Sequence, residues 1–235
     1  MAKVLRHKVV SSVQWLKARK RLLAEEKEFT RRRDKLSAMR RALPWEEVTK
    51  EYSFVGHDGN QNLPALFDGR SQLIIYHFMF HPDWDAGCPH CSRWADSFNR
   101  AIAHLNHRDV TMIAVSRAPY PKLAAYKRRM GWTFKWVSSF GTDFNFDFHV
   151  SFTPEEMARK GFYNFAMQNP DAPEREGVSV FYKNVKRRVF RTYSTFARGI
   201  DMMNVEYQYL DLVPKGRDEG GRGPYWVRRH DEYKN

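Results

Sequence analysis

The chain contains two cysteines, Cys88 and Cys91, which are separated by two residues in the stretch GCPHCSRW. Such a pair can form a reversible disulfide, because one thiolate attacks a substrate and the second thiol resolves the mixed disulfide. The same pair can supply two of the four ligands of a zinc site. It can also be two small buried side chains without any chemistry. The residues around the pair bear on these three interpretations.

The setting of Cys88 favours the redox interpretation. Cys88 follows an apolar run, expected to be a strand, and stands at the start of an expected helix. Pro89 suits the first helical turn, where its missing N–H costs nothing. The free amides and the positive end of the helix dipole then face the Cys88 sulfur, and His90 adds positive charge when protonated. We therefore expect the pKa of Cys88 to lie below about 8.5, with Cys91 as the resolving thiol.

The metal interpretation requires histidines in addition to the two sulfurs. His77 and His81, or His90, would complete a set of two cysteines and two histidines. These histidines fall at irregular spacing, and the sequence has no second CxxC. A metal-binding module using Cys88, Cys91 and a nearby histidine remains an alternative, while the favoured redox function requires no metal and no cofactor.

The elements that position the pair alternate between strands and helices. The apolar run QLIIYHFMF reads as a strand buried on both faces, and apolar residues at helical spacing follow the cysteines. The expected elements are strands at 72–80, 109–116 and 134–140, helices at 91–105 and 121–132, a hairpin at 178–182 and 187–194, and a closing helix at 201–213. This order predicts a mixed α/β fold, in which Cys88 lies at the carboxyl edge of a central strand.

The N-terminal region is expected to form one long helix over residues 10–42, which contain no glycine or proline. One apolar row recurs at steps of seven: Trp15, Leu22, Phe29, Leu36 and Leu43. A single narrow row suits docking along a globular surface better than a self-sufficient coiled coil. That surface is either the protein's own domain or a second subunit, so a homodimer through this helix is one expectation.

Charge is concentrated at the two ends of the chain. Residues 1–43 carry 14 Lys and Arg against 4 Asp and Glu, a net charge of +10. Residues 44–182 carry 14 against 16, a net charge of −2, and residues 183–235 carry 12 against 7, a net charge of +5. A basic end can contact nucleic acid or form a solvated helix face, and no recognised nucleic-acid motif accompanies it. The division predicts a basic helix (1–44), a central domain (45–213) and a basic, Gly-rich C-terminal tail (214–235).

The sequence contains no membrane-spanning pattern. The longest apolar run, residues 73–80, is far too short to cross a bilayer. The basic start MAKVLRHKVV is not followed by an apolar signal region or a cleavage site. We therefore expect a cytoplasmic protein, in which two cysteines do not make a structural disulfide framework.

Several stretches together resemble a bacterial family of thioredoxin-like proteins. They are YHFMFHPDWDAGCPHCSRWAD, AVSRAP, GWTFKWVSSFGTDFNFDF, SVFY, TYSTFARG and WVRRHDEY. That family has been filed as a domain of unknown function and is often labelled thioredoxin family protein. The resemblance covers nearly the whole chain and implies a thioredoxin-like fold related to the peroxiredoxin and thiol-reductase branch.

Three comparisons refine the resemblance. The CPHC tetrad is similar to that of periplasmic disulfide oxidases, whose attacking thiols have low pKa values. Peroxiredoxins carry Pro-x-x-x-Thr-x-x-Cys, whereas here Pro82 lies one position too close and Asp85 stands in place of the threonine. Thioredoxins place a cis-proline before the strand that faces the dithiol, and here Gly177 occupies that position, before Val178.

Three residues outside the tetrad are candidates to line the site. Trp84 lies in the loop that leads to Cys88, and Arg117 follows the neighbouring strand at the same sheet edge. Gly177 could allow close approach of a substrate backbone. Trp84 can equally be a loop anchor, and Arg117 can equally be the partner of a local carboxylate.

The resulting hypothesis is a thiol–disulfide oxidoreductase in which Cys88 attacks and Cys91 resolves, acting on a protein or small-molecule thiol or disulfide. The alternative is a non-catalytic interaction protein on a thioredoxin scaffold, whose basic helix contacts nucleic acid or a protein. The sequence leaves open the substrate and the direction of electron flow.

Overall fold

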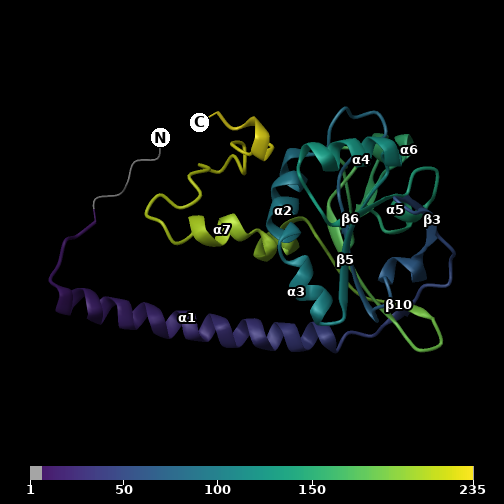
Figure 1. The fold of residues 1–235 in the computed structure, drawn as a ribbon. Helices are drawn as coiled ribbons and strands as arrows, with labels where there is room; N and C mark the ends of the chain where they lie inside the picture. The colour runs from purple at the N-terminus through teal and green to yellow at the C-terminus, as the bar shows by residue number, and fades with distance from the viewer. Residues whose placement is uncertain (1–6, 235) are drawn as a thin grey trace.

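A computed structural model of the chain describes residues 7–234 (Figure 1). Residues 1–6, the start of the segment assigned to the basic helix, lie outside the described residues, as does Asn235. Within residues 7–234, eight strands form one mixed sheet in the order β1-β10-β9-β4-β5-β6-β2-β3. The strands are β1 (Glu46–Glu47), β2 (Ser53–Gly56), β3 (Gly59–Asn62), β4 (Gln72–His77), β5 (Val110–Ser116), β6 (Lys135–Ser138), β9 (Gly177–Lys183) and β10 (Val189–Phe196), with a separate hairpin of β7 (Gly161–Tyr163) and β8 (Ala166–Gln168).

Helices lie on both faces of this sheet, and α1 extends away from it (Figure 1). The α-helices are α1 (Ser12–Arg41), α2 (Pro89–Asn99), α3 (Ile102–His107), α4 (Tyr120–Arg129), α5 (Phe144–Asp147), α6 (Pro154–Ala158) and α7 (Val205–Leu210). Three short 3-10 helices are η1 (Leu63–Phe67), η2 (Ala197–Met203) and η3 (His230–Glu232). No helix within residues 7–234 is both long and apolar enough to cross a membrane.

The centre of the sheet has the connectivity expected from the alternating elements. Strands β4, β5 and β6 are parallel, joined by crossovers through α2–α3 and α4, and β9 pairs antiparallel with β4. Ile75 of β4 therefore faces Ile113 of β5 and Ser179 of β9. The central mixed sheet flanked by helices, with a long N-terminal helix, is a thioredoxin-like α/β fold.

Successive side chains of β4 and β5 point to opposite faces of the sheet, so the core consists of two layers, one on each face. On one face, Ile75 and Ile113 pack with α5 and the segment that follows it. On the other face, Tyr76 and Ala114 pack with α2 and α4. Since most of both faces is covered, β4 is buried from Ile75 on and β5 from Thr111 on, which explains their continuous apolar runs.

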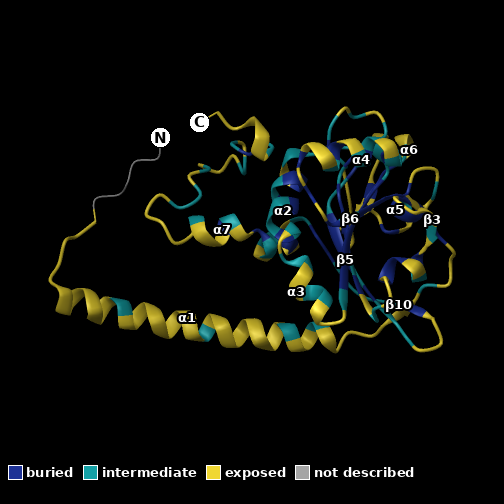
Figure 2. Ribbon diagram, in the orientation of Figure 1, coloured by how far each residue is buried: buried dark blue, intermediate teal, exposed yellow. Residues whose placement is uncertain are grey.

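Helix α1 does not pack along the domain. It begins at Ser11, whose side chain caps the helix in a reciprocal pair with Gln14, and none of its residues is buried (Figure 2). The apolar row expected to dock stays open to solvent, from 43% exposure at Leu36 to 67% at Phe29. Docking on its own domain is therefore absent, because the helix leaves the domain as one rigid rod and only its last turn, where Arg40 lies over Tyr193, reaches the domain.

Two expected helices differ from the structure. The helix expected at 91–105 is interrupted between α2 and α3, beside Asn99, whose side chain accepts hydrogen bonds from the amides of Thr133 and Phe134. The closing helix expected at 201–213 is the end of η2 followed by the short α7. In both places tertiary contacts override a local helical pattern.

The C-terminal segment, residues 214–234, is folded against the domain rather than extended as a tail. Val227 is 3% exposed. Arg229 donates to the Gly87 carbonyl at 2.8 Å and to the Tyr126 hydroxyl at 2.8 Å. Arg129 forms an ion pair with Asp231. The segment that composition marks as separate is therefore part of the same folded unit and reaches the loop that leads to Cys88.

Candidate active site

Cys88 and Cys91 are held at the junction between β4 and α2. The Cys88 amide donates to the Met79 carbonyl at 3.1 Å, and the Met79 amide donates to the Cys91 sulfur at 3.4 Å. Cys88 is the N-cap of α2 and Pro89 occupies its first turn. A Cβ on Gly87 would lie 2.6 Å from a ring carbon of Phe78, so only glycine lets the loop approach the core this closely. Both thiols are free.

The two thiols have opposite electrostatic environments. A hydrogen bond from the Cys91 thiol is the largest cause that lowers the pKa of Cys88; burial opposes it, and the backbone amides of Cys91 and His90 reinforce it. Cys91 is 1% exposed, and burial, followed by the neighbouring Cys88, raises its pKa. The arrangement therefore favours a thiolate on Cys88 and a protonated thiol on Cys91.

His90 differs from its expected role. Partial burial, and then the charge of Arg93, lower the pKa of His90. The side chain is therefore neutral at neutral pH and adds no positive charge to the site. What His90 supplies to Cys88 is its backbone amide at the helix start.

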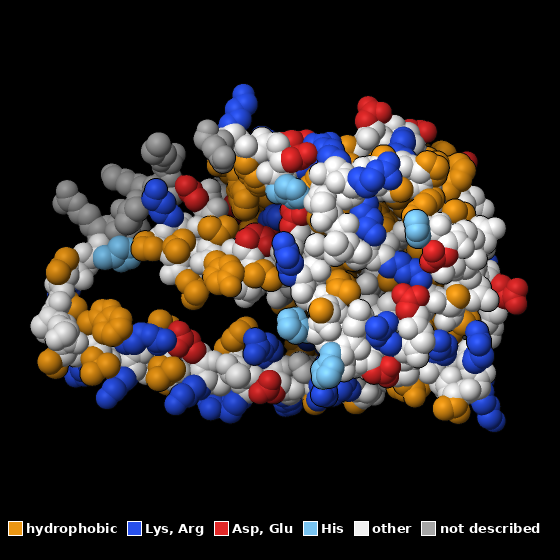
Figure 3. Space-filling view, in the orientation of Figure 1, with side chains coloured by type: hydrophobic (Ala, Val, Ile, Leu, Met, Phe, Trp, Pro, Cys, Tyr) orange, Lys and Arg blue, Asp and Glu red, His pale blue; other side chains and the backbone are white. Residues whose placement is uncertain are grey.

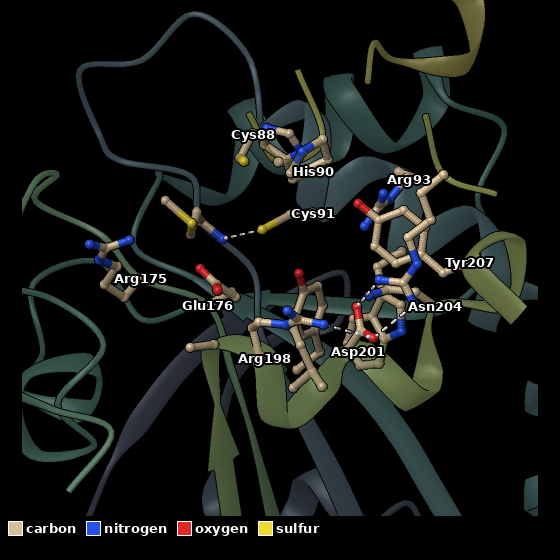
Figure 4. Close-up of a pocket in the computed structure, with 18 of the residues that line it drawn as sticks. Cys88, His90, Cys91, Arg93, Arg175, Glu176, Arg198, Asp201, Asn204 and Tyr207 are labelled. Atoms are coloured by element: carbon tan, nitrogen blue, oxygen red, sulfur yellow. Dashed lines mark hydrogen bonds and ion pairs between the residues drawn. The ribbon is translucent and has the colours of Figure 1, made fainter. Parts of the chain in front are cut away.

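The dithiol lines a cavity of about 440 Å3 (Figure 4). The opposite walls come from the segment before β9, from η2 and α7, and from the C-terminal segment. The lining residues are Tyr76, Met79, Cys88, His90, Cys91, Arg93, Trp94, Arg175, Glu176, Ala197, Arg198, Ile200, Asp201, Asn204, Tyr207, Arg217, Glu219, Gly223 and Pro224. A small molecule or a single extended side chain fits such a space.

Tyr76 is a site residue that the sequence analysis missed. Its side chain is 1% exposed, packs edge-on against Trp94 and is hydrogen-bonded to Cys91. That hydrogen bond lowers the pKa of Cys91, against the larger effect of burial. The sequence could have indicated Tyr76, because successive side chains of β4 point to opposite faces of the sheet and Tyr76 lies on the face that α2 covers.

Glu176 is the second missed residue. It immediately precedes β9 and faces the cavity on the side of Cys91 (Figure 4). Its negative charge raises the pKa of both cysteines, although burial is the larger cause at Cys91. The register argument that identified Gly177 could have found its neighbour, because both stand at the sheet edge opposite the dithiol.

Four sequence-predicted residues lie outside the cavity lining: Pro89, which occupies the first turn of α2, and Trp84, Arg117 and Gly177. The ring of Trp84 is tilted against that of His81, with 6.1 Å between the ring centroids, and the Trp84 carbonyl accepts a hydrogen bond from Lys122 at 2.8 Å. It is therefore a loop anchor.

Arg117 pairs with the buried Glu174 at 2.9 Å and lies over Phe146. Gly177 pairs with His77 across β4 and β9, and a Cβ there would lie 2.5 Å from a ring carbon of Phe196. Glycine at this position serves the contact with Phe196.

The described residues do not assemble the metal ligand set. No group of three or more His, Cys, Asp and Glu able to hold a metal occurs within residues 7–234. His77 lies on the opposite face of the sheet, where its Nε2 is 2.9 Å from the Ser179 hydroxyl. The Nδ1 of His81 accepts from the Asp83 amide at 3.2 Å.

Solved structures with a similar fold include peroxiredoxins. Peroxidoxin BcpB from Mycobacterium tuberculosis matches at 13% identity and a TM-score of 0.44, over 69% of this chain and 95% of that one. Peroxiredoxin Q from Xanthomonas campestris matches at 14% identity and a TM-score of 0.43, over 68% and 96%. The mitochondrial 2-Cys peroxiredoxin from Plasmodium falciparum matches at 13% identity and a TM-score of 0.43, over 72% and 95%.

No curated protein sequence matches the chain. The sequence profile of a bacterial protein family matches residues 4–233, which is nearly the full length and includes α1, the CxxC segment and the C-terminal segment. The chain therefore belongs to the family described as bacterial proteins of unknown function, DUF899.

Proposed function

We propose that the protein is a thiol–disulfide oxidoreductase, with Cys88 as the attacking and Cys91 as the resolving cysteine. The observation that carries the proposal is the difference in environment between the two cysteines at the N-terminus of α2. Cys88 lines the cavity at the N-cap of α2, where the Cys91 thiol and the amides of Cys91 and His90 lower its pKa, whereas Cys91 is 1% exposed and burial raises its pKa. Thiol–disulfide exchange requires a nucleophilic thiolate beside a second, resolving thiol.

The reaction proceeds in two displacements. The Cys88 thiolate attacks one sulfur of a substrate disulfide; a mixed disulfide forms, and the other substrate sulfur leaves as a thiolate. Cys91 then loses its proton and attacks the Cys88 sulfur, which releases the second substrate thiolate. Two electrons pass from the protein to the substrate, and a Cys88–Cys91 disulfide remains. The reverse sequence oxidises a substrate dithiol.

The protein's own groups assist each step. The amides of His90 and Cys91 stabilise the Cys88 thiolate before attack and after release. Once Cys88 is part of the mixed disulfide, its negative charge is gone, so one cause of the high pKa of Cys91 disappears. Resolution is therefore favoured after the first displacement and not before it.

The cavity directs the proposal toward small disulfides or a single inserted peptide segment. Its volume of about 440 Å3 lies in the range of small-molecule sites. Arg175 and Arg198 stand on the wall across from Cys88 and could pair with carboxylates of a substrate (Figure 4). We propose the cytosol as the compartment, where the dithiol form is regenerated by cellular thiols.

Thiol titration tests the proposal. The rate of alkylation by iodoacetamide, followed against pH by mass spectrometry, should report one reactive thiol with a pKa below about 8.5. Cys88→Ser should remove this reactivity and Cys91→Ser should keep it. A Cys88 pKa at or above that of free cysteine would refute the redox function.

Trapping of the intermediate tests the order of the two cysteines. With glutathione disulfide as the probe, Cys91→Ser should accumulate a stable mixed disulfide on Cys88. Cys88→Ser should form none. Equal trapping by both variants would contradict the assignment of attacking and resolving roles.

A second candidate function is binding through α1, favoured by the full exposure of that basic helix. The partner in that case is nucleic acid or a protein. Binding of a DNA or RNA duplex with steep salt dependence, lost on deletion of residues 1–43, would support the nucleic-acid form.

A further inference from the structure

Helix α1 presents an unusual surface for a monomer. Its 30 residues include no buried side chain. The large apolar side chains along it are 40–77% exposed: Val13, Trp15, Leu16, Leu22, Leu23, Phe29, Leu36 and Met39. Between them stand 11 Lys and Arg against 4 Asp and Glu, a net charge of +7 over 12–41. A helix with a long apolar row fits an apolar groove.

The same chain carries a groove of that kind. An apolar cavity of about 410 Å3 lies between the last turn of α1, helices α2 and α3, strands β9 and β10, and the η2–α7 segment. Its lining is dominated by side chains such as Phe98, Leu105, Val178 and Met203. The sheet face is thus left without a covering helix at this position.

The groove continues onto an exposed apolar margin. Along the η2–α7 segment and its end, the exposed apolar side chains are Met202 (47%), Val205 (46%), Tyr209 (67%), Leu212 (81%) and Val213 (48%). Residues 201–213 contain three Asp and Glu and no Lys or Arg, a net charge of −3. Each of these acids is paired within the chain: Glu206 with Arg93, Asp211 with Arg217, and Asp201 with Arg198 and Arg217. The margin is thus the complement of α1 in apolar character.

The two surfaces face one another across an open gap but do not touch. Figure 3 shows hydrophobic side chains on α1 and on the α7 side, with empty space between them. Helix α1 is continuous and leaves the domain at Arg41, so within one chain only its last turn reaches the groove, where Arg40 is part of the lining. The rest of α1 therefore meets no such surface within its own chain.

We propose that α1 acts as an arm that docks on a second copy of this chain. The docking surface, called the seat below, is the groove between α3 and the η2–α7 segment together with the exposed apolar side chains of that segment. Because Arg40 lies at the edge of the groove, a two-fold axis beside it lets each arm enter the other copy's groove. The contact is made twice and closes on itself, so a dimer forms rather than a filament.

The arm is long enough for the interface of a stable dimer. A 30-residue helix is about 45 Å long and presents a strip about 10 Å wide, so each arm can bury up to about 450 Å2 of its accessible surface. With the surface covered on the partner counted as well, two arms could bury up to about 1,800 Å2 in total, and specific interfaces commonly bury about 1,200–2,000 Å2.

Direct pairing of two α1 helices is a poorer arrangement. Every arm is strongly basic, and the heptad position three residues after the apolar row holds Ala18, Glu25, Arg32 and Met39. Nucleic acid is also a poorer occupant, because it would neutralise the cations but leave Trp15, Leu22 and Phe29 in water. A seat on the η2–α7 segment covers the apolar row.

Mass measurement of the full chain tests the proposal. By sedimentation equilibrium, the wild-type protein should have twice the chain mass of 27.9 kDa. Leu22→Glu with Phe29→Glu alters only the arm, and Met202→Glu with Val205→Glu alters only the seat. Since all four side chains are at least 46% exposed, these variants should fold, and each should be monomeric or raise the dissociation constant about tenfold or more.

A matched control and a mixture make the test specific. Val185→Glu introduces the same charge at a side chain that is 99% exposed in the β9–β10 turn, and it should leave the dimer unchanged. Mixing the arm variant with the seat variant should restore a heterodimer, because one of its two contacts is intact. Pairing of α1 with α1 predicts no such restoration.

Three results would overturn the proposal. They are a monomeric wild-type protein, a seat variant that dimerises as tightly as wild type, and a monomer that binds a DNA duplex through α1. None of them depends on the dithiol, so the redox function and the dimer stand or fall separately.

Discussion

Glu174→Gln is a perturbation whose consequence can be worked from the structure. Glu174 is 1% exposed, accepts a hydrogen bond from the Ser151 hydroxyl at 2.6 Å and pairs with Arg117 at 2.9 Å. Burial raises the pKa of Glu174 to about 7, although Ser151 and Arg117 both favour the ionised form. The residue anchors the segment that presents Glu176 to the dithiol.

The raised pKa makes the folded protein less stable as the pH increases. In the unfolded chain the carboxyl titrates at its ordinary value of 4.5, so between that pH and about 7 the folded state keeps a proton that the unfolded chain has lost. At about 1.4 kcal/mol per pH unit, this difference corresponds to about 3 kcal/mol of stability present at pH 4 and lost by pH 8.

Urea unfolding followed by tryptophan fluorescence measures this loss. The free energy of unfolding of wild type minus that of Glu174→Gln should fall by about 3 kcal/mol from pH 4 to pH 8, because the glutamine does not titrate. A matched control, Glu51→Gln at an exposed carboxylate, accounts for the loss of one negative charge from the surface.

Two outcomes would contradict the predicted pH dependence of stability at Glu174. If the difference between wild type and Glu174→Gln does not change over this pH range, Arg117 compensates the burial of Glu174 completely. The carboxylate would then be an ordinary ion-pair partner. If the difference rises with pH, the ion pair outweighs burial and the sign of the effect is wrong.

Three further variants probe the frame of the site. Gly177→Ala should cost about 1–3 kcal/mol in urea unfolding, because the new methyl meets Phe196; adding Phe196→Leu should recover part of the loss, and no recovery would contradict the contact. Arg229→Ala should speed hydrogen exchange across the C-terminal segment while strand β4 stays protected; unchanged exchange would show that its hydrogen bonds do not hold the segment. Tyr76→Phe should prolong the mixed disulfide in rapid-quench mass spectrometry, because Cys91 loses a hydrogen bond that lowers its pKa; unchanged resolution would separate the hydroxyl from the chemistry.

The local elements could be predicted where one pattern dominates. Continuous apolar runs identified the central strands β4 and β5, since strands covered on both faces have no polar side to alternate with. The run without glycine or proline identified α1 to within two residues at each end. Pro89 after Cys88 marked the start of α2, which places Cys88 at the N-cap and Cys91 in the first turn of the same helix.

Contacts between distant segments could not be predicted in the same way. Composition marked residues 214–234 as a tail because they are rich in glycine and charge, but Arg229 and Val227 bind them to the domain. Arg117 was placed at the correct sheet edge, yet its direction was decided by Glu174, 57 residues away. A helical pattern at 201–213 was divided because that segment has to close over Trp94, whose indole donates to the Met203 carbonyl.

The sequence by itself determined that a CxxC pair follows a buried strand and opens a helix, because strand and helix signals are local in the chain. Only the tertiary structure decided what surrounds the pair: Tyr76 on Cys91, Glu176 across from it, and a cavity walled by η2, α7 and the C-terminal segment. Only the tertiary structure, too, left α1 without a surface of its own to cover it. The physical reason is that apolar periodicity records which face an element buries, while the partner of that face depends on how the whole chain packs.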